Sequence, residues 1–316
     1  MIKPLIFSLA LAFPAGAFEL ALPVDCQLGK TCYIQQYADH DARAGAQDFT
    51  CGTLSYDGHD GTDFALPTRA AMRVGVNVLA AAAGTVLNSR DGVADFAAFP
   101  PGQDCGNGVL VQHDDGWQTQ YCHMKQGSVR VSSGDAVAQG QILGQVGQSG
   151  NAAFPHLHLS VRHNADKIDP FGPEVPLGGA HLSCGAAGAD LWSDALPYQP
   201  SGMLAVGISA EIPDYAAIKA GLASPDLPED APALVVWGFM FGLHAGDAVL
   251  FRLTGPAGEV LTERSVIEKP QAQAFRAMGR KLKAATWPAG RYQGAVILQR
   301  RGVELGRQSI EIGVGP

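Results

Sequence analysis

The rhythm of apolar runs and glycines between Gly52 and Pro176 constrains this chain more than any other feature of its sequence. Short runs rich in Val, Ala and Leu alternate with glycine turns there, and a helical period is almost absent, which is typical of β-strands. Asp114-Asp115-Gly116 separates two of the runs and predicts a hairpin. The segment is therefore predicted to be mainly β. The expected strands are Val76–Val86, Val109–His113, Trp117–His123, Ala136–Val146 and His156–Val161.

The last third of the chain is a second block of β character. Turns such as Gly255-Pro256-Ala257-Gly258 separate its apolar runs, and this spacing predicts a small, immunoglobulin-like β-sandwich over residues 201–316. One short helix is expected at Tyr215–Leu222. Residues 177–200 are rich in Gly, Ala and Pro and are predicted to be a linker. The expected strands are Met203–Ile212, Leu234–Leu243, Val249–Leu253, Val260–Ile267, Tyr292–Arg300 and Ser309–Val314.

The N-terminus has the pattern of a secretory signal peptide, expected at residues 1–17. Lys3 supplies a positive start, Pro4–Phe13 form an apolar run, and Ala15-Gly16-Ala17 is a small-x-small cleavage site. That run is too short to span a bilayer, and no later segment approaches the roughly 20 apolar residues that a span requires. Asp25 before Cys26 does not fit a lipoprotein signal. We therefore expect an exported protein with no membrane span.

The cysteines also indicate an exported protein. There are six, at positions 26, 32, 51, 105, 122 and 184. An even number in an exported chain predicts disulfides rather than free thiols. Three of them fall within or next to residues 18–52, which we expect to form a stapled N-terminal arm before the first β region. No Cys-x-x-Cys occurs, so a redox pair or a structural zinc site of cysteines is not expected.

The charge of the chain excludes one class of partner. The 30 acidic residues outnumber the 22 Lys and Arg and give a formal net charge of −8, whereas a nucleic-acid-binding protein carries a basic surface. We therefore expect no nucleic-acid partner, and no polybasic stretch is present for an anionic membrane.

Two histidines occupy alternate positions of the apolar run FPHLHLSV at residues 154–161. Strand side chains repeat with period two, so His156 and His158 are predicted to share one face, while Leu157 and Leu159 share the other. Such a pair is a natural beginning for a metal site, and the alternative is two histidines on the solvated face of an edge strand.

A second pair lies upstream in Gly58-His59-Asp60-Gly61-Thr62-Asp63. The glycines make a helix unfavourable, so we expect a tight loop that runs into a strand at Asp63 and turns His59 and Asp63 toward one ion. With His158 these residues give two imidazoles and one carboxylate. That is the ligand set of a catalytic zinc, which keeps a fourth position open for water.

Taken together, these motifs resemble the lysostaphin-type (LytM) zinc metallopeptidases. The similar elements are the H-x-G-x-D stretch from His59 to Asp63, the triplet Tyr121-Cys122-His123, and the H-x-H of His156 and His158. The glycines from Gly134 to Gly150 are similar to those that punctuate the strands of that family. The resemblance covers about residues 55–172 and implies an antiparallel β-sheet with a groove (the duplicated hybrid motif), expected here over residues 53–176.

The resemblance also implies a chemistry. It assigns zinc to His59, Asp63 and His158, and it places His123 and His156 beside a metal-bound water that attacks a peptide cross-link of bacterial peptidoglycan. No glutamate is positioned as general base, so the two histidines are expected to do that work. The expected substrates are peptidoglycan stem peptides.

Strand alternation then gives an expectation for the cysteines. In the run Trp117–His123 the odd positions are predicted to share a face with His123, so Cys122 is expected to point away from the zinc. Its expected disulfide partner is Cys105, which the hairpin brings opposite. In the arm, Cys26 pairs with Cys32 or Cys51, and Cys184 takes the remaining cysteine. His40 is interpreted as solvated, with a latent fourth zinc ligand as the alternative.

Three functions are compatible with these patterns. The first is a zinc endopeptidase in the periplasm, with secretion as the alternative. The periplasm is favoured because an acidic enzyme is not drawn electrostatically to an anionic cell wall. The second is a non-catalytic protein of the same family that activates a peptidoglycan amidase, although such proteins usually lose zinc ligands and all five site positions are filled here. The third is an adhesin built on the C-terminal region, which is also where a protein partner is expected to bind.

Overall fold

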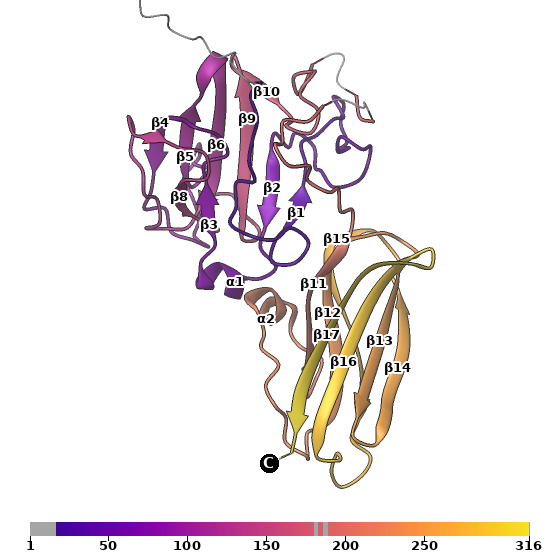
Figure 1. Cartoon of the computed structure of the whole chain (residues 1–316). Helices are drawn as coiled ribbons and strands as arrows, with labels where there is room; N and C mark the ends of the chain where they lie inside the picture. The colour runs from indigo at the N-terminus through magenta and orange to yellow at the C-terminus, as the bar shows by residue number, and fades with distance from the viewer. Residues whose placement is uncertain (1–16, 180–182, 186–188, 316) are drawn as a thin grey trace, which may run out of the picture.

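The computed structural model describes residues 17–179, 183–185 and 189–315, and its chain forms two β regions placed end to end (Figure 1). The predicted signal peptide lies outside the described residues except for its last position. Within the described ranges no helix is long and apolar enough to cross a membrane.

The first region is one antiparallel sheet with the strand order β1-β2-β9-β6-β5-β4-β7, to which β10 adds by pairing with β9. A short pair, β3 and β8, lies beside it. The strands are β1 (Tyr33–Gln36), β2 (Thr62–Ala65), β3 (Asn77–Leu79), β4 (Gly84–Arg90), β5 (Asn107–Gln112), β6 (Trp117–Met124), β7 (Ala136–Val137), β8 (Ile142–Gln145), β9 (His156–His163) and β10 (Asp166–Ile168). A helix α1 (Arg69–Val74) and a 3-10 turn (Asp114–Gly116) complete it.

Two of the expected strands are each divided in the structure. The run Val76–Val86 becomes β3 and β4, because the chain changes partner in the middle: β3 pairs with β8, whereas β4 pairs with β5 and β7. The run Ala136–Val146 becomes β7 and β8, because Gly140, with a φ of 79°, makes a turn between them. An apolar run does not reveal which neighbour each half will pair with, so the sequence suggested single strands.

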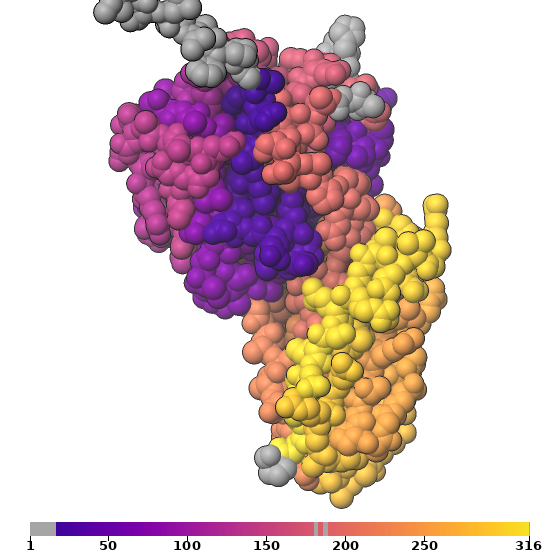
Figure 2. Space-filling model, viewed as in Figure 1, coloured from indigo at the N-terminus to yellow at the C-terminus, as the bar shows by residue number. Residues whose placement is uncertain are grey.

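The N-terminal arm is part of the same sheet. Its strand β1 pairs antiparallel with β2, with Tyr33 opposite Ala65. Farther back, Leu20 donates a backbone hydrogen bond to Leu191, and this segment and the one after β10 lie side by side on the first region (Figure 2). Trp192 is buried against Phe64 and Phe171. Much of the predicted linker therefore packs against the sheet.

The core of the first region lies on one face of β9. Leu157, Leu159 and Val161 are fully buried and pack with Phe64 of β2 and Tyr121 of β6. The alternate residues of β9 point to the opposite face, as period two requires. The predicted division between histidines and leucines in FPHLHLSV is therefore confirmed.

The second region is a β-sandwich. One sheet has the order β11-β12-β15 and the other β14-β13-β16-β17, and their facing side chains form a shared apolar core. Its elements are β11 (Gly202–Ser209), α2 (Tyr215–Ala220), β12 (Ala233–Leu243), β13 (Ala248–Gly255), β14 (Gly258–Val266), β15 (Gln271–Lys281), β16 (Gly290–Arg300) and β17 (Val303–Val314). We infer an immunoglobulin-like sandwich from the division of three and four strands between two antiparallel sheets.

An apolar contact joins the two regions. Trp237, Phe239 and Phe241 of β12 are buried in a cluster that also contains Tyr33 and Ala65 of the first region. The Gln273 side chain of β15 donates a hydrogen bond of 2.7 Å to the Tyr33 hydroxyl. The sandwich thus covers the end of β1 and β2 with a buried surface.

Candidate metal centre

Three side chains that were predicted to bind zinc converge in the structure. His59 Nε2 lies 3.2 Å from Asp63 Oδ1 and 3.1 Å from His158 Nδ1, and His158 Nδ1 lies 2.9 Å from the same carboxylate oxygen. Among the described residues this is the group whose atoms are arranged to hold a metal ion. His59 comes from the loop before β2, whereas Asp63 and His158 lie directly opposite each other on β2 and β9.

The donor set fits zinc. A tetrahedral ion with bonds of about 2.0–2.1 Å places its ligand atoms about 3.3 Å apart, which is close to the three separations observed. His59 Nδ1 donates to the Tyr37 carbonyl at 2.7 Å, and His158 Nε2 lies 2.9 Å from Ser160 Oγ and 3.3 Å from Asp60 Oδ1. Each imidazole therefore turns its remaining nitrogen toward Asp63. When both rings are neutral, three acceptors face one point and need a cation between them, a place that a proton on His158 takes when no metal ion is bound.

The charges at the centre follow from this geometry. Burial opposes ionisation of Asp63, but the neighbouring imidazoles of His156 and His59 and the hydrogen bond from His158 outweigh it, so the pKa of Asp63 lies well below its usual range. Burial also opposes protonation of His158, yet its hydrogen bonds to Asp60 and Asp63 raise its pKa to about 9. A positive charge at this point is therefore strongly favoured.

The two predicted catalytic histidines lie beside the group. His156 Nε2 is 3.6 Å from Asp63 Oδ1, and the rings of His123 and His156 have their centroids 4.6 Å apart. His123 Nδ1 donates to the Ser149 carbonyl and His156 Nδ1 to the Phe154 carbonyl, each at 2.8 Å. Both Nε2 atoms are thereby left as acceptors.

Both of these imidazoles are held neutral. Burial, together with the nearby imidazoles of His156 and His158, lowers the pKa of His123 to about 3. Burial lowers the pKa of His156 as well, although the Asp63 carboxylate opposes the shift. Neutral rings with a fixed Nδ1–H are suited to accept a proton at Nε2.

The predicted face of Cys122 is wrong. Cys122 stands opposite His158 in the β6–β9 register and lines the same groove, so strand alternation places Cys122, and not His123, on the metal face. His123 reaches the centre because its backbone adopts a φ of 62°, which interrupts the alternation. Left-handed backbone at a single non-glycine residue has no signature in a run of alternating side chains, so sequence reasoning missed it.

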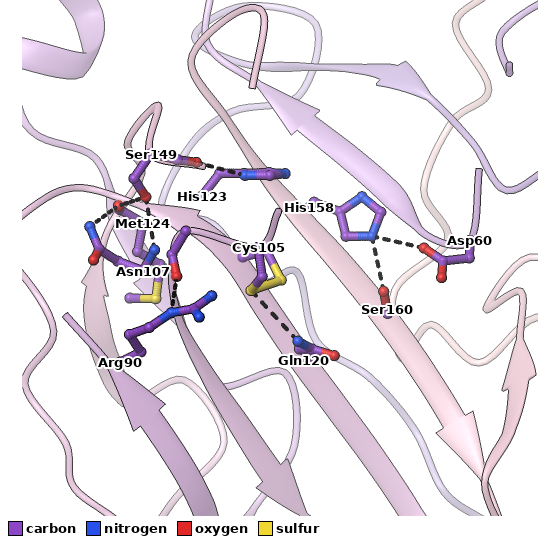
Figure 3. Close-up of a disulfide and its surroundings, with 12 residues drawn as sticks. Asp60, Arg90, Cys105, Asn107, Gln120, His123, Met124, Ser149, His158 and Ser160 are labelled. Atoms are coloured by element: carbon purple, nitrogen blue, oxygen red, sulfur yellow. Dashed lines mark hydrogen bonds and ion pairs between the residues drawn. A yellow bond between two sulfur atoms is a disulfide. The ribbon is translucent and has the colours of Figure 1, made fainter. Parts of the chain in front are cut away.

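The expected disulfides are present. Cys105 pairs with Cys122 as predicted, and the arm uses the first of its two alternatives, Cys26–Cys32, which leaves Cys51–Cys184. Figure 3 shows the Cys105–Cys122 bridge between His123 and His158. The Cys105 carbonyl accepts a hydrogen bond of 2.8 Å from the His123 backbone N–H. The bridge therefore borders the groove and does not supply a metal ligand.

Sequence reasoning missed the residues that orient the ligands. Asp60 and Ser160 hold His158, and the Tyr37 carbonyl, which belongs to the arm, holds His59. Ser160 had a readable signal, because it lies two residues after His158 on the same strand face. Tyr37 had none, since any residue can supply a backbone carbonyl.

Another predicted role for the arm is wrong. His40 is buried and its Nε2 lies 2.7 Å from Asp169 Oδ2, so it is neither solvated nor directed at the metal centre. The arm instead contributes Asp39, whose carboxylate accepts hydrogen bonds from the backbone N–H groups of Asp41, Gln47 and Gly58. The arm thereby braces the loop that carries His59.

A β-sheet groove with a His-Asp-His group and two neutral imidazoles is an arrangement typical of metal-dependent hydrolases. Residues 57–170 match the sequence model of Peptidase family M23. The predicted resemblance to LytM-type peptidases is therefore confirmed over that segment.

Three curated proteins are similar in sequence to part of this chain. The cell division protein DipM of Caulobacter vibrioides is 37% identical over 106 residues, which are 33% of this chain and 17% of DipM. The DD-carboxypeptidase/endopeptidase Mpg of Neisseria meningitidis serogroup B is 31% identical over 123 residues, 37% and 23% of the two chains. The peptidoglycan DD-endopeptidase ShyA of Vibrio cholerae is 29% identical over 119 residues, 38% and 24%. The match thus spans less than a quarter of each of these relatives.

Proposed function

We propose that this protein is a zinc-dependent endopeptidase that hydrolyses peptide cross-links of bacterial peptidoglycan. The observation that carries the proposal is the convergence of three potential ligand atoms, from His59, Asp63 and His158, beside two neutral imidazoles in a segment that matches family M23. The printed names of Mpg and ShyA, which describe endopeptidases, support the same reaction.

Each residue has a distinct task in this proposal. His59, Asp63 and His158 would hold a zinc ion, which when bound would act as a Lewis acid and lower the pKa of a water at the site. Of His123 and His156, one accepts the proton of the attacking water at Nε2 and then passes it to the leaving amine. The other donates a hydrogen bond to the oxygen of the scissile carbonyl, a task that requires a proton on its Nε2 in the reacting complex. Asp60, Ser160 and the Tyr37 carbonyl keep the two liganding rings oriented.

We further propose that the protein works in the periplasm, with secretion as the alternative. Three disulfides and no free cysteine among the described residues support an oxidising compartment.

The competing proposal is a non-catalytic activator of an amidase. The complete set of five site residues favours hydrolysis, since binding alone does not require two neutral histidines beside a metal group.

Digestion of purified sacculi tests the choice. The mature protein should contain about one zinc per chain and release un-cross-linked muropeptides that mass spectrometry identifies. A chelator should abolish release and zinc should restore it. Zinc-loaded protein that releases nothing alone but accelerates a purified amidase would support the activator instead.

A further inference from the structure

The groove beside the metal centre continues along β9 to a single arginine. His158, Ser160 and Arg162 lie on the same face of that strand, and all three line a groove with His123 and the Cys105–Cys122 bridge. Among the described residues that line it, Arg162 is the only lysine or arginine. The groove thus has one permanent cation, four residues from a metal ligand.

The arginine is held in place by the strand next to it. Arg162 Nη2 donates to Gln120 Oε1 of β6 at 2.7 Å, and Gln120 Nε2 lies 3.6 Å from the sulfur of Cys105 (Figure 3 shows Gln120 beside the bridge). The guanidinium is therefore fixed at the groove by one of its five N–H donors. The others stay available for a ligand, and a carboxylate matches this planar fork.

The groove's own carboxylates do not neutralise this arginine. Asp60 Oδ2 lies 2.5 Å from Lys167 Nζ, and Asp60 Oδ1 faces His158. Asp104 also lines the groove, but no ion pair joins it, or any other described carboxylate, to Arg162. A half-buried guanidinium without an anionic partner is a site for an anionic ligand.

We propose that Arg162 binds a carboxylate of the substrate's stem peptide, so that the enzyme selects acidic stems over stems in which that carboxylate is amidated. This inference rests on the proposed function. Four residues of strand span about 13 Å, and an extended peptide covers that length in about four residues. The recognised carboxylate therefore lies a few residues from the cleaved bond, within one stem peptide.

The test compares two substrates that differ in one group. A soluble cross-linked muropeptide with free stem carboxylates is set against the same muropeptide with those carboxylates amidated. Wild-type protein should show a kcat/KM about tenfold higher for the free form, the usual effect of a charge-assisted hydrogen bond. Arg162→Gln should lose this preference by slowing only the free form, with zinc content unchanged, and Arg162→Lys should recover part of it.

Arg264→Gln is the matched control, because it removes the same charge from an exposed position on the sandwich. Binding of un-cross-linked stem peptides, free or amidated, to each zinc-loaded variant is measured in parallel by calorimetry. An Arg162→Gln variant that keeps the preference, or that slows both substrates equally, overturns the inference. Wild-type protein that binds free stems more tightly but cleaves neither substrate retains the carboxylate site and refutes the proposed hydrolysis.

Discussion

Strands β9 and β12 are interior strands of their sheets, and they use their two faces differently. In β9 the leucines at 157 and 159 enter the core, while His156, His158 and Arg162 point to the opposite face, where His158 and Arg162 line the groove. In β12 both faces are apolar and buried: Leu234, Val236 and Met240 enter the sandwich core, and Trp237, Phe239 and Phe241 cover the first region.

This comparison shows which strand positions of a β protein can accommodate polar site residues. A strand that buries one face in a core and leaves the other beside a groove can carry polar residues at every second position. A strand packed on both faces cannot, because each buried polar group without a partner costs free energy. The sandwich therefore contributes packing to the first region, and the candidate site residues lie on the face of the sheet that borders the groove.

Removal of a ligand from β9 should have the largest effect. His158→Ala leaves two groups at the metal centre, so zinc and activity should both be lost. Metal analysis and muropeptide cleavage measure the two outcomes. A folded variant that keeps one equivalent of zinc would show that the metal is held elsewhere.

His156, on the same face, should behave differently. His156→Ala leaves His59, Asp63 and His158 in place, so it should keep zinc and lose on the order of 10²–10⁴ in kcat, the usual range for a positioned acid or base. Circular dichroism and metal analysis provide the controls. If this variant loses zinc as completely as His158→Ala while folded, the two histidines do not have separate tasks.

On β12, replacing a large side chain by alanine should lower stability and leave peptide cleavage almost unchanged. Phe239→Ala creates a cavity between the regions and should lower the free energy of unfolding by about 3–5 kcal/mol, with zinc content unchanged. Denaturant unfolding followed by tryptophan fluorescence measures the loss. Phe251→Ala, in the sandwich core alone, is the control: it should destabilise the sandwich but spare the packing around Tyr33.

Removal of the sandwich tests directly whether it stabilises the first region without taking part in the chemistry. The sequence suggests that the sandwich is dispensable, because no candidate catalytic residue lies beyond Pro176. A chain that ends at Pro200 keeps Trp192 but exposes Tyr33, Ala65 and Phe154. It should still bind zinc and cleave a soluble muropeptide, with a lowered midpoint of thermal unfolding. A truncated chain as stable as the full one would refute the structural role of β12.

The smallest effect is expected at His40 and Asp169, a buried titratable pair outside the groove. Burial opposes the charge on His40, but the hydrogen bond and the negative charge of Asp169 raise its pKa above the ordinary 6.5. Because the folded pKa is the higher one, the pair stabilises the fold fully below about pH 6.5 and loses that contribution as the pH rises through the folded value. His40→Gln should remove this pH dependence from the free energy of unfolding measured with urea. An unchanged dependence of that free energy on pH would contradict the prediction.

The ligand set was predictable because it rests on local patterns. The alternation of His156 and His158 with leucines is visible in eight residues, and the glycines around His59 indicate a loop. The third strand of the sandwich's smaller sheet, β15, was missed because most of its apolar residues are alanines separated by Gln, Arg and Gly, and Phe275 and Met278 are its only large apolar side chains.

What could not be predicted depends on partners distant in the chain. Both faces of β12 are apolar, and nothing in that strand says that one face covers Tyr33, which lies some 200 residues earlier in the sequence. The position of His123 depends on one backbone torsion, which the register with β5 and the Cys105 carbonyl impose. Contacts of this kind override local pattern.

The left-handed backbone at His123 places the stability of the fold and the proposed catalytic activity in conflict. Glycine adopts a φ of 62° more readily than histidine does, and asparagine is another residue that commonly visits this region, but neither can carry a proton between a water and an amine. Selection for stability alone would therefore favour their appearance at this position. Histidine and asparagine codons differ by one nucleotide. On the proposed function, a single mutation would turn the hydrolase into a sturdier protein that still holds its metal and its peptide and no longer cuts.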